Sequence, residues 1–434
     1  MARTIGGPPP EKPSPGRQEE FFEESFEIHV VTPLFGGGVT AGVVDATNPI
    51  RGTSIRGQLR FWWRATVGRS CTSSKELYER ESALWGNTGR ASRVSLSVAN
   101  CQKGSLFPCA SFPPDKNFPR FNDGFPPYAL FPFQGKKANG RVTQEPGEAL
   151  KGSAFTLLVR GPQSARSELF QALRAWVCFG GLGARTRKGA GSLYCPTLSP
   201  DVQDNLALWL QEHFGNLSGD KTGPLPWPTL GRAVLIEKKS GDPIRVWNQA
   251  INLYKDFRQG KEVGRNPGRE HNRPGRSRWP EADAIRNLAG THDLQHEPDP
   301  HKPCAFPRAS FGLPIITHFK DSGRNGLDPE DTELYPVKDK EKKDRMASPV
   351  IVKPLATDKT KAVALIAVLN APLPDNLELH LKGENLLKGQ QAEIITSASA
   401  TYGKSPLKNR SPRGDAIEAL IAFAKEQGFR EVTS

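Results

Sequence analysis

The chain has few of the side chains from which metal sites and acid–base sites are built. Its 434 residues include only two methionines and eight histidines, which leaves little material for metal binding or for proton transfer near neutral pH. Long hydrophobic runs are also absent. The best candidate covers about residues 362–369, whereas a helix that spans a bilayer needs about 20 apolar residues. We therefore expect no cofactor, no metal and no membrane partner.

Disulfide pairs and export signals are equally scarce. The six cysteines are widely separated and none forms a Cys-x-x-Cys pair, so we expect reduced thiols in a cytoplasmic protein rather than a disulfide framework. No stretch resembles a signal peptide. Residues 1–20 are rich in proline and glycine and have no apolar core, so we expect them to form a disordered tail.

Positive charge is plentiful. The chain has 59 Lys and Arg against 46 Asp and Glu, a formal net charge of +13, and its pI is about 9.5. This balance favours a polyanionic partner such as nucleic acid, an anionic membrane surface or an acidic protein. The alternative is a soluble protein that charge keeps dispersed. The length predicts two or three domains.

The first half alternates strands and helices in a recognisable order. Phe26, Ile28 and Val30 share one face of a predicted strand. Leu169 and Leu173 form part of the apolar stripe of a predicted helix. The expected elements are a strand at 26–31, a helix from the N-cap Ser54 to Gly68, a helix at 75–84, strands at 93–98 and 154–160, a helix at 167–179, and a strand at 192–195. This order predicts a ferredoxin-like domain over residues 21–196. Residues 100–152 show no period and are expected to form an irregular Phe/Pro-rich insertion.

A helix near 202–214 and a linker make up residues 197–231, and a second unit covers 232–434. Its expected strands lie at 233–238, 310–319, 348–354 and 362–369, with helices at 246–257 and 415–427. This order is compatible with a second, decorated ferredoxin-like domain. The predicted fold class is therefore α+β, with tandem ferredoxin-like (RRM-like) domains, long loop insertions and a C-terminal helix.

Three arginines lie on one face of the helix that follows Ser54. Arg56, Arg60 and Arg64 are spaced i, i+4 and i+8 with no acid interleaved, and Trp63 lies at the border of this face. One interpretation is a ladder of guanidinium groups for phosphates, with Trp63 free to stack on a base. In the other interpretation the arginines pair with acids elsewhere in the fold, and Trp63 belongs to the core.

A glycine-rich turn carries the second concentration of charge. Residues 181–191 read GLGARTRKGAG, and glycines let backbone N–H groups approach an anion. The candidate RNA-binding residues of this turn are Gly183, Arg185, Thr186, Arg187, Lys188 and Gly189. The turn lacks the Gly-Lys-Ser/Thr of a nucleotide-phosphate loop, and its helix-to-strand context is wrong for a dinucleotide fingerprint. A tight turn that needs glycine only for its geometry is the alternative.

The third concentration is an arginine-rich arm at 258–279. Only two acids accompany its seven cations, which are Arg258, Lys261, Arg265, Arg269, Arg273, Arg276 and Arg278. Such arms commonly become ordered on RNA, and we include Arg276 and Arg278 among the RNA-binding candidates. A solvated loop is the alternative interpretation.

Catalytic and metal constellations are poorly supported. His292, His296, His301 and Cys304 lie close together in sequence but lack zinc spacing. His29, beside Glu27 on the first strand, is expected to be structural.

A ribonuclease would need a base and an acid at the scissile bond. His29 with Tyr78 or Tyr128, or Asp45, could supply them, but none has a partner at a motif spacing. We therefore expect no enzymatic activity.

Two motifs together carry a family resemblance. The segments IRGTSIRGQLRFWWRA at 50–65 and GGLGARTRKGAGS at 180–192 resemble the RAMP superfamily, specifically the first-numbered subunit of the Cmr effector complex of type III-B CRISPR systems. The segments at 277–286, 306–315 and 345–354 are also similar to family segments. The resemblance spans about residues 26–370, and the first two motifs as a pair are specific.

The resemblance implies a pair of ferredoxin-like domains. It implies a non-catalytic subunit that contacts guide RNA, near its 3′ part, or target RNA, and that assembles with other RAMP subunits while another subunit cleaves the target. It carries RNA-binding roles over to Arg56, Arg60, Trp63, Arg64, Gly183, Arg185, Arg187, Lys188 and Gly189. The alternatives are a RAMP endoribonuclease that processes guide RNA and a scaffold that binds only protein.

Overall fold

The structure is a computed structural model. It describes residues 19–38, 42–122, 124–218, 225–267, 275–298, 304–320, 322, 326–397 and 405–433. The tail expected at 1–20 therefore lies outside the described residues except for its last two. No helix in the described ranges is both long and apolar enough to cross a membrane.

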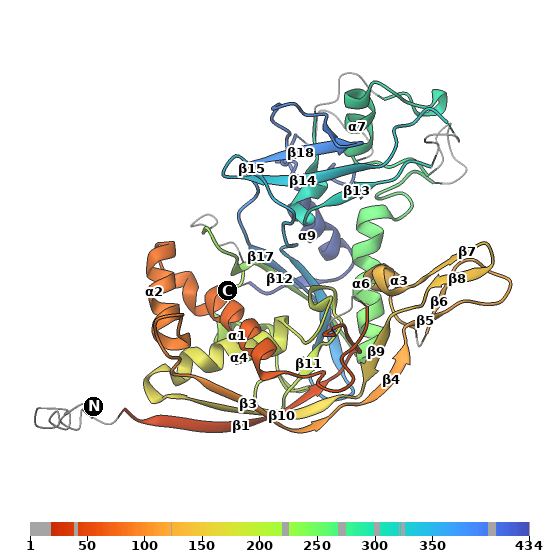
Figure 1. Ribbon diagram of the computed structural model, residues 1–434. Helices are drawn as coiled ribbons and strands as arrows, with labels where there is room; N and C mark the ends of the chain where they lie inside the picture. Colours follow the sequence, from red (N-terminus) through yellow and green to blue (C-terminus); the bar gives the residue numbers. More distant parts are fainter. Residues whose placement is uncertain are drawn as a thin grey trace, which may run out of the picture.

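The first unit is a four-stranded antiparallel sheet with two helices on one face. Its strands are β1 (Phe21–Val30), β3 (Ser95–Gln102), β10 (Ala154–Pro162) and β11 (Leu193–Tyr194), in the order β11-β1-β10-β3. Helices α1 (Gly52–Thr66) and α4 (Arg166–Phe179) pack against each other above this sheet (Figure 1). The alternation in β1 places Phe22, Phe26 and Ile28 in the core. The predicted strand–helix–strand–strand–helix–strand order is confirmed here.

The start of α1 differs from the prediction. Ser54 is not the N-cap, because α1 begins at Gly52 and the amide of Ile55 already donates to the carbonyl of Arg51. The cap residue Arg51 makes no side-chain cap hydrogen bond. A short 3-10 helix, η1 (Val67–Ser70), and helix α2 (Ser74–Trp85) follow α1.

The insertion at 100–152 is more regular than expected. It contains β4 (Ser105–Pro108), β5 (Ala110–Ser111), β6 (Arg120–Phe121), β7 (Lys136–Ala138), β8 (Arg141–Gln144), β9 (Glu148–Lys151), the one-turn helix α3 (Pro127–Leu130) and the 3-10 turn η2 (Phe131–Phe133). β9 pairs with β4 and with β2 (Leu34–Phe35). Aromatic contacts such as Phe35 with Phe133, at 5.1 Å between ring centroids, hold the segment together. Strands of two to four residues are too short to reveal a period in the sequence.

The second unit repeats the same element order. Its strands are β12 (Thr229–Gly241), β16 (Val350–Ala356), β17 (Ala362–Asn370) and β20 (Arg430–Glu431), in the order β16-β17-β12-β20 and antiparallel throughout. Helix α6 (Pro243–Gln259) follows β12, and α9 (Ala416–Glu426) precedes β20. Helix α5 (Leu206–Phe214) lies in the segment between the two units.

Both faces of the second sheet are covered. All nine residues of β17 are buried. Ala364 and Ile366 belong to the core under α6 and α9, whereas Val363 and Leu365 belong to the core of the first unit. Because alternate residues of one strand enter two different cores, β17 reads as a continuous apolar run rather than as an alternating pattern. One face of the second sheet therefore packs on its own helices, and the other face packs on the core of the first unit.

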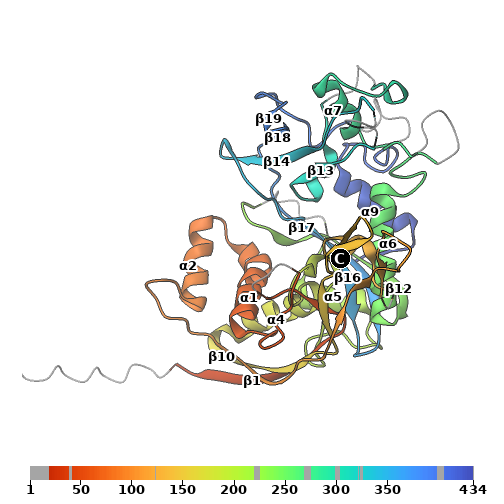
Figure 2. The same ribbon diagram turned by 45° about the vertical axis from the view of Figure 1, so that its right-hand side comes forward.

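Two long insertions of the second unit combine into a third sheet. β13 (Ile315–Thr317), β14 (Thr332–Lys338) and β15 (Glu341–Lys342) lie between α6 and β16, whereas β18 (Asn376–Leu381) and β19 (Glu384–Asn385) lie between β17 and α9. With α7 (Glu281–Ala289) they form a separate lobe that both views show at the top (Figures 1 and 2). We call it the insertion lobe.

The prediction of a strand at 310–319 is wrong. The segment begins with the 3-10 helix η6 (Pro307–Phe311), and only Ile315–Thr317 is a strand. Pro314 explains the late start, because proline has no amide hydrogen to donate to a ladder.

A buried lysine joins the two units at the end of α4. Lys353 on β16 is fully buried, and its Nζ lies 2.7 Å from the carbonyl of Gly180 and 3.3 Å from that of Val177. These are carbonyls that the end of a helix leaves without intrahelical partners. Burial lowers the pKa of Lys353 to about 7, with Cys178 acting weakly in the opposite direction.

This lowered pKa predicts a pH-dependent contribution to stability. Between about pH 7 and the ordinary lysine value near 10.4, the unfolded chain holds a proton that the folded chain lacks, so the free energy of unfolding rises with pH by at most about 1.4 kcal/mol per unit. We expect urea unfolding to show wild type gaining about 1–2 kcal/mol over Lys353→Met between pH 7.5 and 9. The exposed Lys239→Met is the control and should show no such change. A difference between wild type and Lys353→Met that is independent of pH would contradict the lowered pKa.

Candidate nucleic-acid interface

The arginines of α1 are engaged with the first unit. Arg60 Nε and Arg64 Nη1 lie 2.7 and 2.6 Å from the same carboxylate oxygen of Glu81 on α2. The Glu81 side chain is only 8% exposed, so this acid is the distant partner that the second interpretation of the helix required. The two arginine side chains are one-third exposed. Their main contacts join α1 to α2.

Arg56 also binds within the protein. Its guanidinium donates to the carbonyl of Trp85, at the end of α2, and to that of Val94 at 3.1 Å. Its Cζ atom lies 5.7 Å from the centroid of the Trp85 ring. Burial lowers the pKa of Arg56, and Arg60 adds a repulsive contribution in the same direction. The three arginines thus hold α1, α2 and the approach to β3 in place.

Trp63 is not available for base stacking. The interpretation that it belongs to the core is confirmed, and the RNA-binding role that the resemblance carried over to it is wrong. The residue is 1% exposed, and its indole N–H donates to Glu168 at 3.0 Å. The neighbouring Trp62 is 2% exposed. Both rings fill the core between α1 and α4, so burial of their apolar area decides their position.

The glycine-rich turn is wedged between the two units. Its 3-10 helix η4 (Thr186–Lys188) is flanked by two left-handed residues, Arg185 at φ 61° and Gly189 at φ 84°. A Cβ on Gly189 would lie 2.5 Å from the Trp247 ring of α6, and the Trp247 indole donates to the carbonyl of Lys188. Glycine at 189 is therefore required by packing, as the geometric interpretation of the turn proposed.

Two of the three cations in this turn face inward. Lys188 Nζ is buried 3.9 Å from the centroid of the Tyr254 ring and has no hydrogen-bond partner among the described residues. Burial, reinforced by Arg258 and the neighbouring arginines, holds its pKa well below the ordinary lysine value. Lys188 is therefore not a surface contact for RNA, which corrects the sequence prediction. Arg187 donates to the carbonyl of Ser348 and lies 5.4 Å over the Phe61 ring.

The exposed part of the turn is its first half. Gly183 and Arg185 are exposed, and Thr186 and Arg187 are partly exposed. Burial of part of the Arg185 guanidinium lowers its pKa. The turn therefore offers Arg185 and the edge of Arg187 to a ligand rather than a cluster of three cations.

A basic groove lies where Arg187 meets the insertion lobe, and we call it the junction groove. It encloses about 240 Å³. All of its charged lining residues in the described chain are basic: Arg187, Arg232, Lys338, Lys343 and Arg345. Its apolar lining comes from prolines and from Leu369, Leu373 and Ile417. Three separate stretches of chain supply the cations, around residues 187, 232 and 338–345, so the groove exists only when both units and the lobe are assembled.

Two of these cations are uncommitted. Arg232 pairs with Asp415, and Lys343 pairs with Glu341. Lys338 and Arg345 are exposed and form no ion pair within the described residues. Sequence reasoning missed both residues, although Arg345 begins the family-like segment 345–354. An isolated arginine beside a predicted strand gives no signal by itself.

The arginine-rich arm is folded back against the second unit. Arg258 is enclosed by the rings of Tyr254 and Phe311, at 5.7 and 5.3 Å. Arg278 Nε donates to Asn266 at 3.0 Å and also binds the carbonyl of Glu262. These contacts order the described parts of the arm, residues 258–267 and 275–279, without a ligand, so these parts are neither fully solvated nor dependent on RNA for their order.

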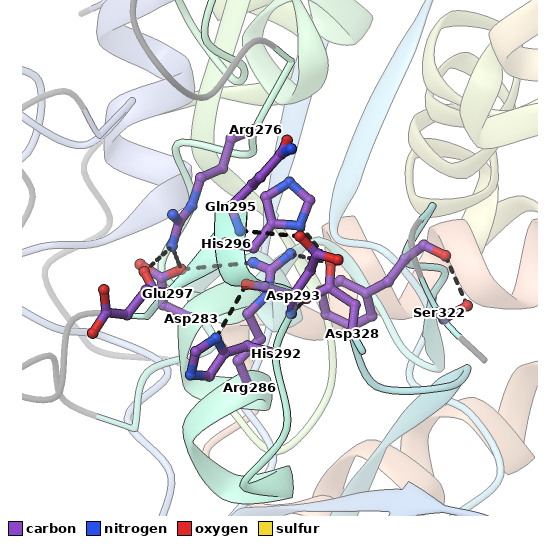
Figure 3. A network of polar contacts seen from close by, with 11 residues as sticks. Arg276, Asp283, Arg286, His292, Asp293, Gln295, His296, Glu297, Ser322 and Asp328 are labelled. Carbon is purple, nitrogen blue, oxygen red and sulfur yellow. Dashed lines mark hydrogen bonds and ion pairs between the residues drawn. The ribbon is translucent and has the colours of Figure 1, made fainter. Parts of the chain in front are cut away.

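Arg276 fixes the arm to α7. Its guanidinium contacts Asp283 and the carbonyl of Glu297, at 3.2 Å for the latter (Figure 3). Arg269 and Arg273, which were part of the expected arm, lie outside the described residues. Lys261 and Arg265 are exposed.

The histidines after α7 have separate partners. His296 Nδ1 lies 2.7 Å from Asp328, and His292 Nδ1 lies 3.1 Å from the carbonyl of Asp293 (Figure 3). His301 lies outside the described residues. Among the described residues, no group of three His, Cys, Asp or Glu side chains is arranged to hold a metal ion.

The residues weighed for a ribonuclease lie in different surroundings. His29 Nε2 is 2.6 Å from Glu27, and its ring lies 6.3 Å from that of Tyr194. The hydroxyl of Tyr78, on α2, accepts a hydrogen bond from the side-chain amide of Asn87, and the ring of Tyr128 packs against that of Tyr254.

Asp45 accepts hydrogen bonds from the amides of Thr47 and Asn48, at 3.0 and 2.9 Å. That arrangement is a local turn. The contacts of the described residues therefore give none of these candidates a catalytic partner.

Comparison with known proteins places the chain in a family. The family model of the RAMP superfamily matches residues 27–194. The "CRISPR system Cmr subunit Cmr1-2" of Pyrococcus furiosus is 30% identical over 183 residues, which are 40% of this chain and 94% of that protein. "Cmr1-1" of the same organism is 30% identical over 191 residues, 43% of this chain and about half, 52%, of that protein.

Two solved structures are also similar. The crystal structure of apo Cmr1 from P. furiosus aligns over 95% of this chain and 99% of its own, with a TM-score of 0.45 and 17% identity. A chain of the type III-B Cmr-beta complex, solved by cryo-EM with cognate target RNA and AMPPnP, aligns over 81% of this chain and 95% of its own, with a TM-score of 0.44 and 11% identity.

Two matches establish the family. The alignment covers 94% of the shorter P. furiosus protein, and the superfamily model covers the first sheet and its helices. The chain belongs to the RAMP superfamily, and within it to the Cmr subunits of CRISPR systems.

Proposed function

We propose that this chain is a non-catalytic RNA-binding subunit of a type III-B CRISPR ribonucleoprotein. It would hold the 3′ region of the guide RNA, the target RNA or both through backbone contacts, beside other RAMP subunits in the cytoplasm. The observation that carries the proposal is the junction groove, whose charged lining in the described chain is entirely basic. A purely protein-binding scaffold does not need such a lining.

The groove has the chemistry that a sugar–phosphate chain requires. Arginine presents a planar fork of donors that matches the oxygens of a phosphate. Arg345 supplies one such fork, and Arg187 adds the edge of its guanidinium. The prolines and leucines of the lining offer apolar surface to sugars and bases. Phosphate contacts position RNA without reading its sequence, so specificity would come from pairing between guide and target.

We also propose that the two repeated units are tandem ferredoxin-like domains. Each has the order strand–helix–strand–strand–helix–strand, and in each the first strand lies between the third and the fourth. Family membership supports this assignment. The RNA-binding groove would then lie at the junction of the two domains rather than on an open face of the second sheet, because that sheet has both faces covered.

Removing the uncommitted cations tests the groove. We expect Lys338→Ala/Arg345→Ala to weaken binding of labelled single-stranded RNA in fluorescence anisotropy. The slope of log K against log salt should become shallower by about 1.4, because each phosphate contact to a single strand contributes about 0.7. Lys238→Ala/Lys239→Ala removes the same charge from the exposed end of β12 and should bind like wild type. Equal binding by the groove variant and this control would contradict the proposal.

The arginines of α1 allow a second test. Glu81→Gln removes the buried negative charge that Arg60 and Arg64 share. We expect the free energy of unfolding to fall by about 2–4 kcal/mol, because the two cations lose their counter-ion and keep only a neutral acceptor. RNA affinity of the folded variant should change little. A clear gain in RNA affinity would show instead that the freed arginines form a phosphate ladder that Glu81 masks.

The absence of cleavage is directly measurable. We expect single-stranded guide precursor and target RNA to stay intact during prolonged incubation with the purified chain, because His29 and the tyrosines have structural partners. Denaturing gels would detect any products. Discrete cuts that vanish in His29→Ala would assign a ribonuclease activity and overturn this part of the proposal.

A further inference from the structure

A second basic cavity lies between the arginine-rich arm and the insertion lobe, and we call it the arm cleft. It encloses about 760 Å³, which is within the range of ligand-binding sites. Its permanently charged lining is formed by Arg258, Arg265, Arg276, Arg286, Arg308 and Lys320, together with the single described carboxylate Asp328. The family-like segments 277–286 and 306–315 contribute five of its lining residues, among them Ala282 and Ile315.

Part of this positive charge is neutralised by carboxylates that pair with the lining arginines. Asp328 binds Arg286, and Asp283 binds Arg276. Glu281, which is 3% exposed, pairs with Arg308. These carboxylates fix the guanidinium groups in place, so the donors are ordered before any ligand arrives.

The remaining cations of the lining have no paired carboxylate among the described residues. Arg265 and Lys320 are exposed and form no ion pair within the described residues. Arg258 is enclosed by aromatic rings. Three cations therefore exceed the paired carboxylates, and a polyanion is the ligand that this excess favours.

One hydrogen-bond donor of Arg286 has no acceptor among the described residues. Its side chain is 5% exposed, and its Nε and Nη2 each lie 2.8 Å from the oxygens of Asp328 (Figure 3). Its Nη1 is buried, has no hydrogen-bond partner among the described residues, and lies 3.7 Å from Asp283. A buried donor without an acceptor is unfavourable, and a phosphate oxygen in the cleft would supply the acceptor.

The arm cleft and the junction groove share one wall. Arg308 and Ser310 both belong to the short helix η6, but Arg308 lines the arm cleft and Ser310 lines the junction groove. Similarly, β13 lines the cleft through Ile316, whereas its partner β14 lines the groove through Lys338. The two cavities thus open on either side of the same piece of the insertion lobe.

We propose that the arm cleft binds the phosphodiester backbone of a second segment of the same single strand that the junction groove holds. This inference rests on the proposed function and extends it. The insertion lobe would separate the two RNA-binding cavities, and the described part of the arm would line the second cavity. Two linked sites raise affinity through effective concentration without new base contacts.

The test compares strands of two lengths. Arg265→Ala/Lys320→Ala removes the two exposed cleft cations, which are free of ion pairs in the described chain, so the variant should fold normally. We expect it to weaken anisotropy-measured binding of an RNA of roughly 30 nucleotides at least about tenfold, since avidity is lost. On a strand of roughly six nucleotides the loss should be small. The charge-matched Lys238→Ala/Lys239→Ala control should resemble wild type on both.

The outcomes separate this inference from the proposed function. If the cleft variant matches the control while Lys338→Ala/Arg345→Ala loses affinity, the arm cleft is not a nucleic-acid site and the proposed function stands. If neither variant differs from the control, both proposals fail. An equal loss on both strand lengths would contradict a shared strand. DNA strands of the same sequence identify the contact: an equal loss on DNA supports recognition of the backbone alone, and a loss confined to RNA supports an added contact to the 2′-hydroxyl.

Discussion

The burial of both faces of the second sheet is the constraint on which the rest of the structure depends. Alternate residues of β17 enter two cores, so neither unit can complete its core without the other. Lys353 crosses this boundary and binds the last carbonyls of α4, at the point where the glycine-rich turn begins. The turn then packs against Trp247 through Gly189. Charge and glycine in this motif therefore serve assembly of the two units first, and only Arg185 and Arg187 extend toward a ligand.

The sequence predicted elements well where a single period operated. β1 and α4 show clean alternation and a clean helical stripe, and both are confirmed. It predicted poorly where proline or short strands intervened: Pro314 delays a strand, and the strands within 100–152 are too short to show a period. The strand expected at 362–369 is confirmed as β17, because a continuous apolar run bounded by polar residues is typical of a strand buried on both faces. The sequence also could not show whether a cation faces solvent. Lys188 and Arg187 look alike in the sequence, yet one lies against the Tyr254 ring and the other reaches the groove.

The groove and the cleft are products of tertiary assembly. Arg187 comes from the first unit, Arg232 from β12, Lys338 from β14 and Arg345 from the approach to β16. The local sequence does not show that Lys338 and Arg345 line a groove, because this depends on Arg187 and Arg232, which lie more than 100 residues earlier in the sequence. The two insertions that form the lobe bring these residues together, which gives the decorations of the second unit a function: they turn a packed pair of sheets into a surface with two basic cavities.

The most direct test of the account is to map where RNA touches the intact chain. Single-stranded RNA carrying 4-thiouridine would be crosslinked to wild-type protein by light, and the attached peptides would be identified by mass spectrometry. The account predicts crosslinks on the peptides that line the junction groove, around Lys338 to Ala347 and around Pro372. Crosslinks confined to the exposed faces of α1 and α2, with none in the groove, would contradict it.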